Sequence, residues 1–165
     1  MSHDARGVAN AILDLADQAG IEVTPLKLQK LIYFAHGHSL RTRGHELVFN
    51  SFLAWDHGPV VHVVYKQFSD LQHRKIDRRA SWQNFATGNI EIAYAQLSEE
   101  EVICLSEAMS MYGPVDAYTL SKMSHVPNGP WSIVRSAPES YPGGLISKEL
   151  ITRYFGETIW RLHRQ

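Results

Sequence analysis

The stretch TPLKLQKLIYFAHGHSLRTRG, residues 24–44, carries the signals of one complete helix. Thr24 is a natural N-cap, and Pro25 suits the first helical position, where a missing N–H costs nothing. Gly44 suits the position just after a helix, and the two arginines before it suit the negative end of the helix dipole. Apolar residues at helical spacing form one face: Leu28, Leu31, Ile32 and Ala35. The sequence therefore predicts a helix here with that face buried.

Further helices are predicted on both sides of this segment. Upstream, apolar residues recur at helical spacing over 8–19, and Gly20 ends the pattern. Downstream, Ser98 and Glu101 have capping-box spacing, which starts a helix that ends at about residue 112. A last helix is predicted to begin near Ser147. We therefore expect a mainly α fold, a compact helical bundle with a single domain over residues 1–165.

The region between these helices changes period. Apolar residues alternate over 46–55, which indicates two short strands, as a small β-hairpin or an extended insertion. In AWDHGPVV, residues 54–61, we expect Trp55 to end the extended segment and pack inward. Asp56 or Gly58 would then cap a helix that starts at Pro59. Residues 72–91 are polar and cationic and are predicted to form a long loop, with shorter loops at 126–131 and 138–144.

Composition is that of an ordinary globular protein. With 165 residues, 44% of them hydrophobic and 20% charged, the chain is long enough to bury a core without covalent cross-links. The single cysteine, Cys104, makes an internal disulfide impossible, and no uninterrupted apolar run reaches the length of a membrane span. Acidic residues near the N-terminus argue against a secretory signal. We therefore expect a cytoplasmic protein without a membrane partner.

No residue pattern predicts catalysis or a bound cofactor. The nine histidines, at positions 3, 36, 38, 45, 57, 62, 73, 125 and 163, include no pair spaced to face each other on a helix. Cys104 falls on or beside the apolar face of a predicted helix, where thiols are inert. Nucleophile-elbow, Walker A and dinucleotide motifs are absent. We expect no catalytic residues, metal or cofactor, and a metal-dependent hydrolase built on His57 and His62 stays a lesser alternative.

A DNA-binding transcriptional regulator is the main alternative that the sequence leaves open. Residues 8–44 read as two helices around a glycine-containing turn, loosely like a helix-turn-helix, with Lys27 and Lys30 on the second helix. The cationic segment 73–79 adds local positive charge. However, the second helix continues as the apolar LIYFAHG, and the formal net charge is −1. Nucleic acid is therefore not the expected partner.

Several segments resemble one protein family. LKLQKLIYFAHGHSL, FLAWDHGPVVHVVYKQF, HVPNGPW and ISKELITRYF stand in the order typical of the Panacea domain, a prokaryotic and phage family to which SocA-type antitoxins belong. The resemblance covers about residues 8–157. It implies a cytoplasmic antitoxin that neutralises a cognate protein toxin by direct binding, and toxins paired with this family are very diverse. For the SocA-like branch it also implies a proteolytic adaptor that delivers the toxin to a ClpXP-type protease.

The resemblance also selects residues for the family pattern and for candidate partner contacts. Asp56 and His57 depart from the residues usual in the family, so the resemblance does not support a catalytic Asp-His pair. We therefore expect a non-enzymatic antitoxin. The candidate partner-binding residues are Lys27, Gln29, Lys30, Tyr33, Trp55, Gly58, Pro59, Tyr65, His125 and Trp131.

Overall fold

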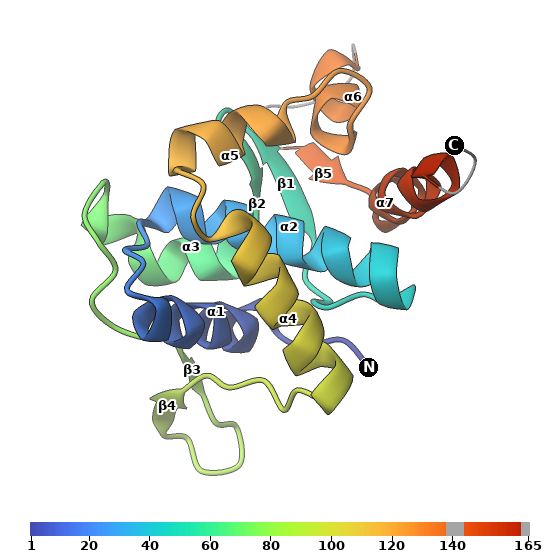
Figure 1. Ribbon diagram of the computed structural model, residues 1–165. Coiled ribbons are helices and arrows are strands. Elements are labelled where there is room, and N and C mark those ends of the chain that lie inside the picture. Colours follow the sequence, from blue (N-terminus) through green and yellow to red (C-terminus); the bar gives the residue numbers. More distant parts are fainter. Residues whose placement is uncertain (138–143, 163–165) are drawn as a thin grey trace.

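The structure, a computed structural model, describes residues 1–137 and 144–162 (Figure 1). Helices dominate the described residues, which confirms the predicted mainly α fold. The helices are α1 (Ala5–Ala19), α2 (Pro25–Arg43), α3 (His62–Phe68), α4 (Glu99–Tyr112), α5 (Ala117–Ser124), α6 (Pro130–Ser136) and α7 (Lys148–Leu162), with a short 3-10 helix, η1 (Ser69–Leu71). The strands are β1 (Phe52–Trp55), β2 (Gly58–Val60), β3 (Ser81–Gln83), β4 (Ile90–Ile92) and β5 (Gly144–Ile146).

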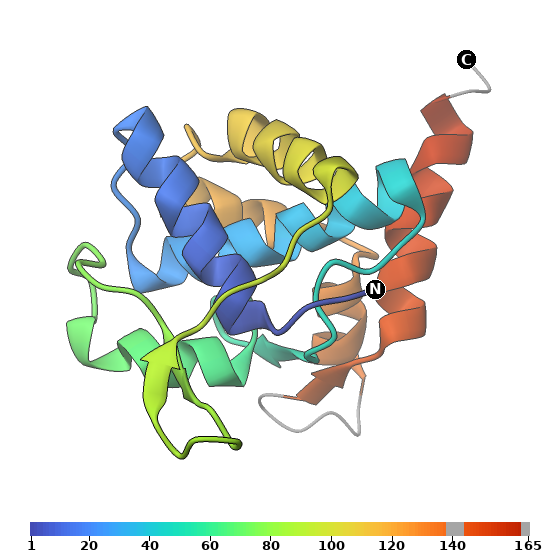
Figure 2. The same cartoon turned by 90° about the horizontal axis from the view of Figure 1, so that it is seen from below.

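Helix α2 lies at the centre of the fold and is buried on all sides over residues 27–40. It contacts α1, α3, α4, α5 and α7, and Figure 2 shows α7 beside the C-terminal end of α2. The prediction of one buried face was therefore incomplete, because Gln29, Lys30 and Ser39 are buried too, each with a hydrogen-bond partner. The absence of a side chain at Gly37 leaves room for Phe155 of α7. Ring carbons of Phe155 lie 2.4 Å from the position that a Cβ on Gly37 would occupy.

The predicted helix ends are confirmed by their capping contacts. The Thr24 side chain accepts a hydrogen bond from the Lys27 amide, and Gly44 takes a left-handed conformation after α2. Ser98 and Glu101 form the reciprocal capping box of α4, which ends at Tyr112. These short-range signals were readable in the sequence because each cap involves residues only a few positions apart.

Strands β1, β2 and β5 form an antiparallel sheet in the order β2-β1-β5. A β-hairpin is therefore present, but only its first strand, β1, lies within the predicted range 46–55, and the second strand follows at 58–60. The expectation of a helix starting at Pro59 was wrong. Gly58, at a φ of 112°, turns the chain back along β1, so Pro59 lies in a strand and α3 begins only at His62, without a side-chain cap. The loop predicted at 138–144 lies outside the described residues except for Gly144.

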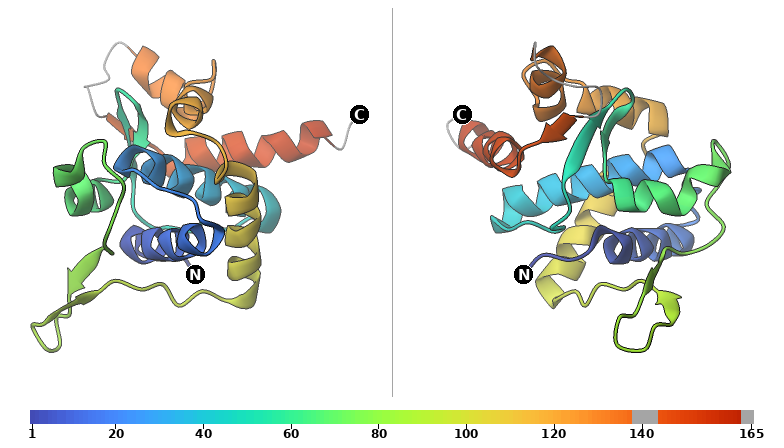
Figure 3. Two further views of the ribbon diagram at one scale, coloured as in Figure 1. Left: turned by 60° about the vertical axis from the view of Figure 1, so that its left-hand side comes forward. Right: turned by 180° about the vertical axis from the view of Figure 1, so that it is seen from behind.

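The long loop predicted at 72–91 contains a second hairpin, formed by β3 and β4. Asn10 of α1 holds its base, because its side-chain amide donates to the carbonyls of Ala80 and Ala93 at 2.9 and 2.7 Å and accepts from the Ala80 amide. Figure 3 shows this hairpin standing away from the helices in both views. Its large apolar side chains are exposed, namely Phe85 (96%), Ile90, Ile92 and Tyr94.

Candidate functional site

Two polar side chains of α2 bind the backbone of strand β2. Gln29 accepts a hydrogen bond from the Val61 amide at 2.8 Å and donates one to the Val61 carbonyl at 3.2 Å. Lys30 donates to the Pro59 carbonyl at 2.8 Å. We call this contact between Gln29, Lys30 and residues 58–61 the helix–hairpin joint. It joins two segments that carry the sequence resemblance, LKLQKL and AWDHGPVV.

The joint covers one edge of the sheet, that of β2. β2 is an edge strand, and an edge strand usually presents unpaired N–H and C=O groups to which another strand can add. Here Gln29 satisfies both backbone groups of Val61, Lys30 satisfies the Pro59 carbonyl, and Pro59 has no N–H. A Gln and a Lys on α2 therefore take the place of a neighbouring strand.

Lys30 is an unusual residue for this place because it is fully buried, with 0% of its surface exposed. Burial lowers the pKa of its ammonium group to about 7, since the charged form loses its hydration. Gly58 makes room for it: a Cβ on Gly58 would lie 2.6 Å from Lys30 Cε and 2.5 Å from Ser124 Oγ. The lysine and the glycine are thus a matched pair.

Helix α6 anchors the other strand of the hairpin. The Trp131 indole N–H donates to the Trp55 carbonyl at 2.6 Å, and Arg135 donates to the Ala54 carbonyl at 3.2 Å. The His125 ring stacks on Trp131 with ring centres 3.7 Å apart. Burial, together with the charge of Lys30 nearby, lowers the pKa of His125. The HVPNGPW segment therefore meets AWDHGPVV directly.

A groove of about 1140 Å³ opens beside the joint. The N-terminal end of α2 and the β1–β2 hairpin line it together with α3, η1 and α5. Its apolar surface comes from Leu26, Trp55, Val64, Tyr65, Phe68 and Tyr118. Its polar surface includes Gln29, His57, His73, Ser121, Lys122 and His125.

The structure divides the ten candidate residues into two groups. Buried residues with structural contacts form the first group: Lys27, Gln29, Lys30, Tyr33, Gly58 and Pro59. Of these, Gln29 also lines the groove. Residues at or beside the groove form the second: Trp55, Tyr65, His125 and Trp131, of which Trp131 contacts the groove residue His125. Trp55 is only half-buried and packs edge-on against Tyr65, so it does not pack into the core as expected.

Sequence reasoning missed Tyr118 and Lys122 of α5. Tyr118 is 71% exposed, and the Lys122 ammonium lies 5.2 Å from the centre of its ring. Their i,i+4 spacing was a readable signal, since residues four apart share a face wherever the segment is helical. Nothing in the sequence indicated that this face would border a groove formed by residues 25–73.

The structure speaks against the DNA-binding alternative. Lys27 is buried and donates to the Gly113 carbonyl at 2.6 Å, and Lys30 is buried in the joint, so neither can reach a DNA groove. In the cationic segment 73–79, Arg78 pairs with Asp70, and Arg79 pairs with acidic residues of α1. This segment therefore offers less free positive charge than its sequence suggests.

Within residues 1–137 and 144–162, no group of three His, Cys, Asp or Glu side chains is arranged to hold a metal ion. Cys104 is buried, and burial raises the pKa of its thiol, which disfavours the reactive thiolate. Neither His57 nor His62 is joined there by further ligands. The described residues thus provide no support for a metal-dependent hydrolase.

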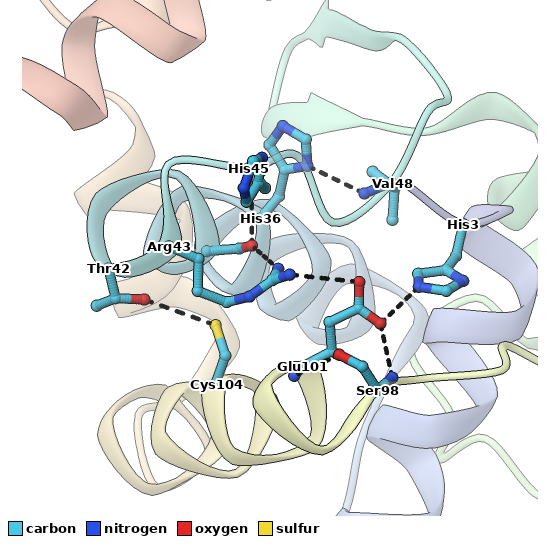
Figure 4. Close-up of polar contacts among 10 residues, drawn as sticks. His3, His36, Thr42, Arg43, His45, Val48, Ser98, Glu101 and Cys104 are labelled. Carbon is cyan, nitrogen blue, oxygen red and sulfur yellow. Dashed lines mark hydrogen bonds and ion pairs between the residues drawn. The ribbon is translucent and has the colours of Figure 1, made fainter. Parts of the chain in front are cut away.

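A second polar cluster lies at the opposite end of α2 (Figure 4). Glu101 Oε2 lies 2.8 Å from His3 Nε2, its other oxygen lies 3.5 Å from Arg43, and it accepts from the Ser98 amide. Burial alone would raise the pKa of Glu101, but the Ser98 and His3 hydrogen bonds and the Arg43 charge outweigh it and lower the pKa. The cluster ties the N-terminus, α2 and α4 together and adjoins no groove residue, so we assign it a structural role.

Comparisons with known proteins agree with this arrangement of motifs. Residues 28–132 match the family model described as Antitoxin SocA-like, Panacea domain. The chain is 36% identical over 137 residues to Antitoxin SocA of Caulobacter vibrioides (strain NA1000 / CB15N), covering 83% of this chain and 73% of the relative. No solved structure matches significantly. In the part of the chain that the structure describes, no helix is both long and apolar enough to cross a membrane. The chain belongs to the SocA-like antitoxin family, which is defined by the Panacea domain.

Proposed function

We propose that this protein is a non-enzymatic antitoxin that neutralises a cognate protein toxin in the cytoplasm by direct binding. The observation that carries the proposal is the 36% identity to Antitoxin SocA over most of both chains. The matched residues include the joint and most of the groove. The polar side chains of the joint are used to hold backbone, which fits a binding module better than a catalyst.

The same proposal includes a role as a proteolytic adaptor that delivers the toxin to a ClpXP-type protease. An adaptor must hold its cargo and contact the protease at the same time, which requires two separate exposed surfaces. The protein has the groove beside α5 and, apart from it, the exposed apolar side chains of the β3–β4 hairpin. Exposed apolar patches of this kind are typical of protein-binding sites.

Co-expression with the product of the neighbouring gene tests the proposal. We expect that product to arrest growth when expressed alone, and growth to recover when this protein is expressed with it. The two purified proteins should elute together in size-exclusion chromatography. If no complex forms and growth arrest is unchanged, the antitoxin proposal is wrong.

The adaptor role needs its own measurement. The purified neighbouring gene product should be degraded by ClpXP faster in the presence of this protein than in its absence. Equal degradation rates would reject the adaptor role and leave neutralisation by binding in place.

A further inference from the structure

The groove beside α5 has the features of a site for a peptide segment. Resting on the proposed function, we propose that it binds an extended segment of the toxin. In this binding mode an aromatic or aliphatic side chain of that segment inserts between α3 and α5, and a neighbouring carboxylate pairs with Lys122.

The size and lining of the groove fit such a segment. Its volume of about 1140 Å³ exceeds that of most small-molecule pockets, which lie at roughly 300–1,000 Å³. Helix α5, eight residues long, gives a wall of about 12 Å, which matches an extended segment of three to four residues. The aromatic residues Trp55, Tyr65 and Tyr118 come from three different elements and provide rigid apolar surface. Such residues are typical of the energetic centres of protein interfaces.

The positive charge in the groove favours an acidic toxin segment over a neutral or basic one. Among the residues that the structure describes, Lys122 is the only lysine or arginine lining the groove, and no carboxylate forms an ion pair with it. Asp56 also lines the groove, but its carboxylate pairs with Arg135 at 2.8 Å. Asp116, outside the lining, accepts hydrogen bonds from Thr119. The groove therefore presents an unpaired positive charge next to exposed aromatic rings. A carboxylate beside an apolar side chain is its chemical complement.

The toxin segment must be recognised through side chains, because it cannot form backbone hydrogen bonds with the edge of β2. Strand addition to β2 would need free N–H and C=O groups on its outer edge, and Gln29 and Lys30 occupy those groups. The toxin segment therefore lies across the groove and is read through Tyr118, Tyr65 and Lys122. This predicts that charge and apolar content of the segment matter more than its strand propensity.

The test measures binding of the neighbouring gene product to variants of this protein that keep their fold. Tyr118→Ala and Lys122→Glu alter exposed groove residues that stabilise no core contact. Each should weaken binding by about tenfold or more, since central aromatic and charged interface residues usually contribute this much. Ile103→Ala and Arg153→Glu are controls for an exposed apolar side chain and an exposed cation elsewhere, and both should bind like the unchanged protein. Phe85→Ala tests the β3–β4 hairpin as the alternative toxin contact.

Overlapping synthetic peptides that span the neighbouring gene product identify the segment. A binding peptide should contain a carboxylate within a few residues of an aromatic or aliphatic side chain. It should quench or shift tryptophan fluorescence in the unchanged protein and lose most of that signal in Trp55→Phe. Circular dichroism on each variant confirms that the helices are retained.

The outcomes separate this inference from the proposed function. If the unchanged protein fails to bind the neighbouring gene product, the proposed function fails. If it binds and both groove variants bind equally well, the toxin contacts another surface and the groove inference is wrong. Loss of binding in Phe85→Ala alone would place the toxin on the β3–β4 hairpin and would also overturn it. Loss confined to the groove variants supports it.

Discussion

Lys30 makes the stability of this protein depend on pH in a direction that can be calculated. Folded and unfolded chains hold the proton of this lysine with different strength, because burial lowers its pKa from 10.5 to about 7. Below about pH 7 both states are protonated. Between about pH 7 and pH 10.5 the unfolded chain keeps a proton that the folded chain has released, so the free energy of unfolding rises with pH.

The size of the effect follows from the same two pKa values. At about 1.4 kcal/mol for each pKa unit, releasing the proton costs roughly 5 kcal/mol at neutral pH. Lys30→Met removes this cost but leaves the Pro59 carbonyl without its donor, which costs about 1–3 kcal/mol at any pH. We therefore expect the variant to be more stable than the unchanged protein at about pH 7, and this advantage to shrink by about 2 kcal/mol at about pH 9.

Urea unfolding, followed by circular dichroism at several pH values, measures the free energy of unfolding of both proteins as a function of pH. A reducing agent keeps Cys104 reduced. The Lys30 charge also affects the pKa of His125, but that pKa is lowered from 6.5 and so lies below this pH range. Above about pH 7 the remaining groups contribute equally to both proteins, so the difference between the curves isolates Lys30. Lys66→Met, which removes an exposed lysine, should give a curve parallel to that of the unchanged protein. If the Lys30→Met curve is also parallel over this range, the lysine is not held in the buried position described.

Two further predictions concern other contacts of the fold. Gly58→Ala should destabilise the protein by about 2–4 kcal/mol in urea unfolding, because the backbone has a φ of 112° and the new Cβ would lie within 2.6 Å of two side chains. Gly88→Ala, at a φ of 74° but in open space, should cost only about 1 kcal/mol, and equal losses would refute the role of close packing. Glu101→Gln should lower the free energy of unfolding by about 2–3 kcal/mol, because His3 loses its charged partner. Glu99→Gln, at an exposed position of the same helical turn, should change it by less than about 0.5 kcal/mol, and a comparable loss would contradict this account.

The elements that the sequence predicted well are those specified by neighbouring residues. The caps at Thr24 and Gly44 and the capping box of α4 each depend on contacts within a few positions. Elements specified by distant residues were missed. Strand β5 is three residues long and exists because it pairs with β1, some ninety positions earlier. The sequence at Pro59 fits either a helix start or an edge strand, and contacts from Gln29 and Lys30 decide between them.

The same physical reason limits what could be predicted of the candidate site. The resemblance indicated the segments, yet most of the selected residues on α2 are buried, because α4, α5 and α7 cover faces that the sequence pattern left as exposed. The side chains of the open groove wall, Tyr118 and Lys122, lie outside the segments on which the resemblance was based. Their position became apparent only when α5 was placed beside α3 and the hairpin.

The separation between buried joint residues and exposed wall residues bears on how one fold can bind different partners. Gln29, Lys30, Gly58 and Pro59 hold the hairpin against α2, so changing them would disturb the frame of the groove itself. Exposed wall residues such as Tyr118 can change without altering any core contact, since their side chains face solvent. Substitutions confined to the walls can therefore alter charge and shape in the groove at little cost in stability.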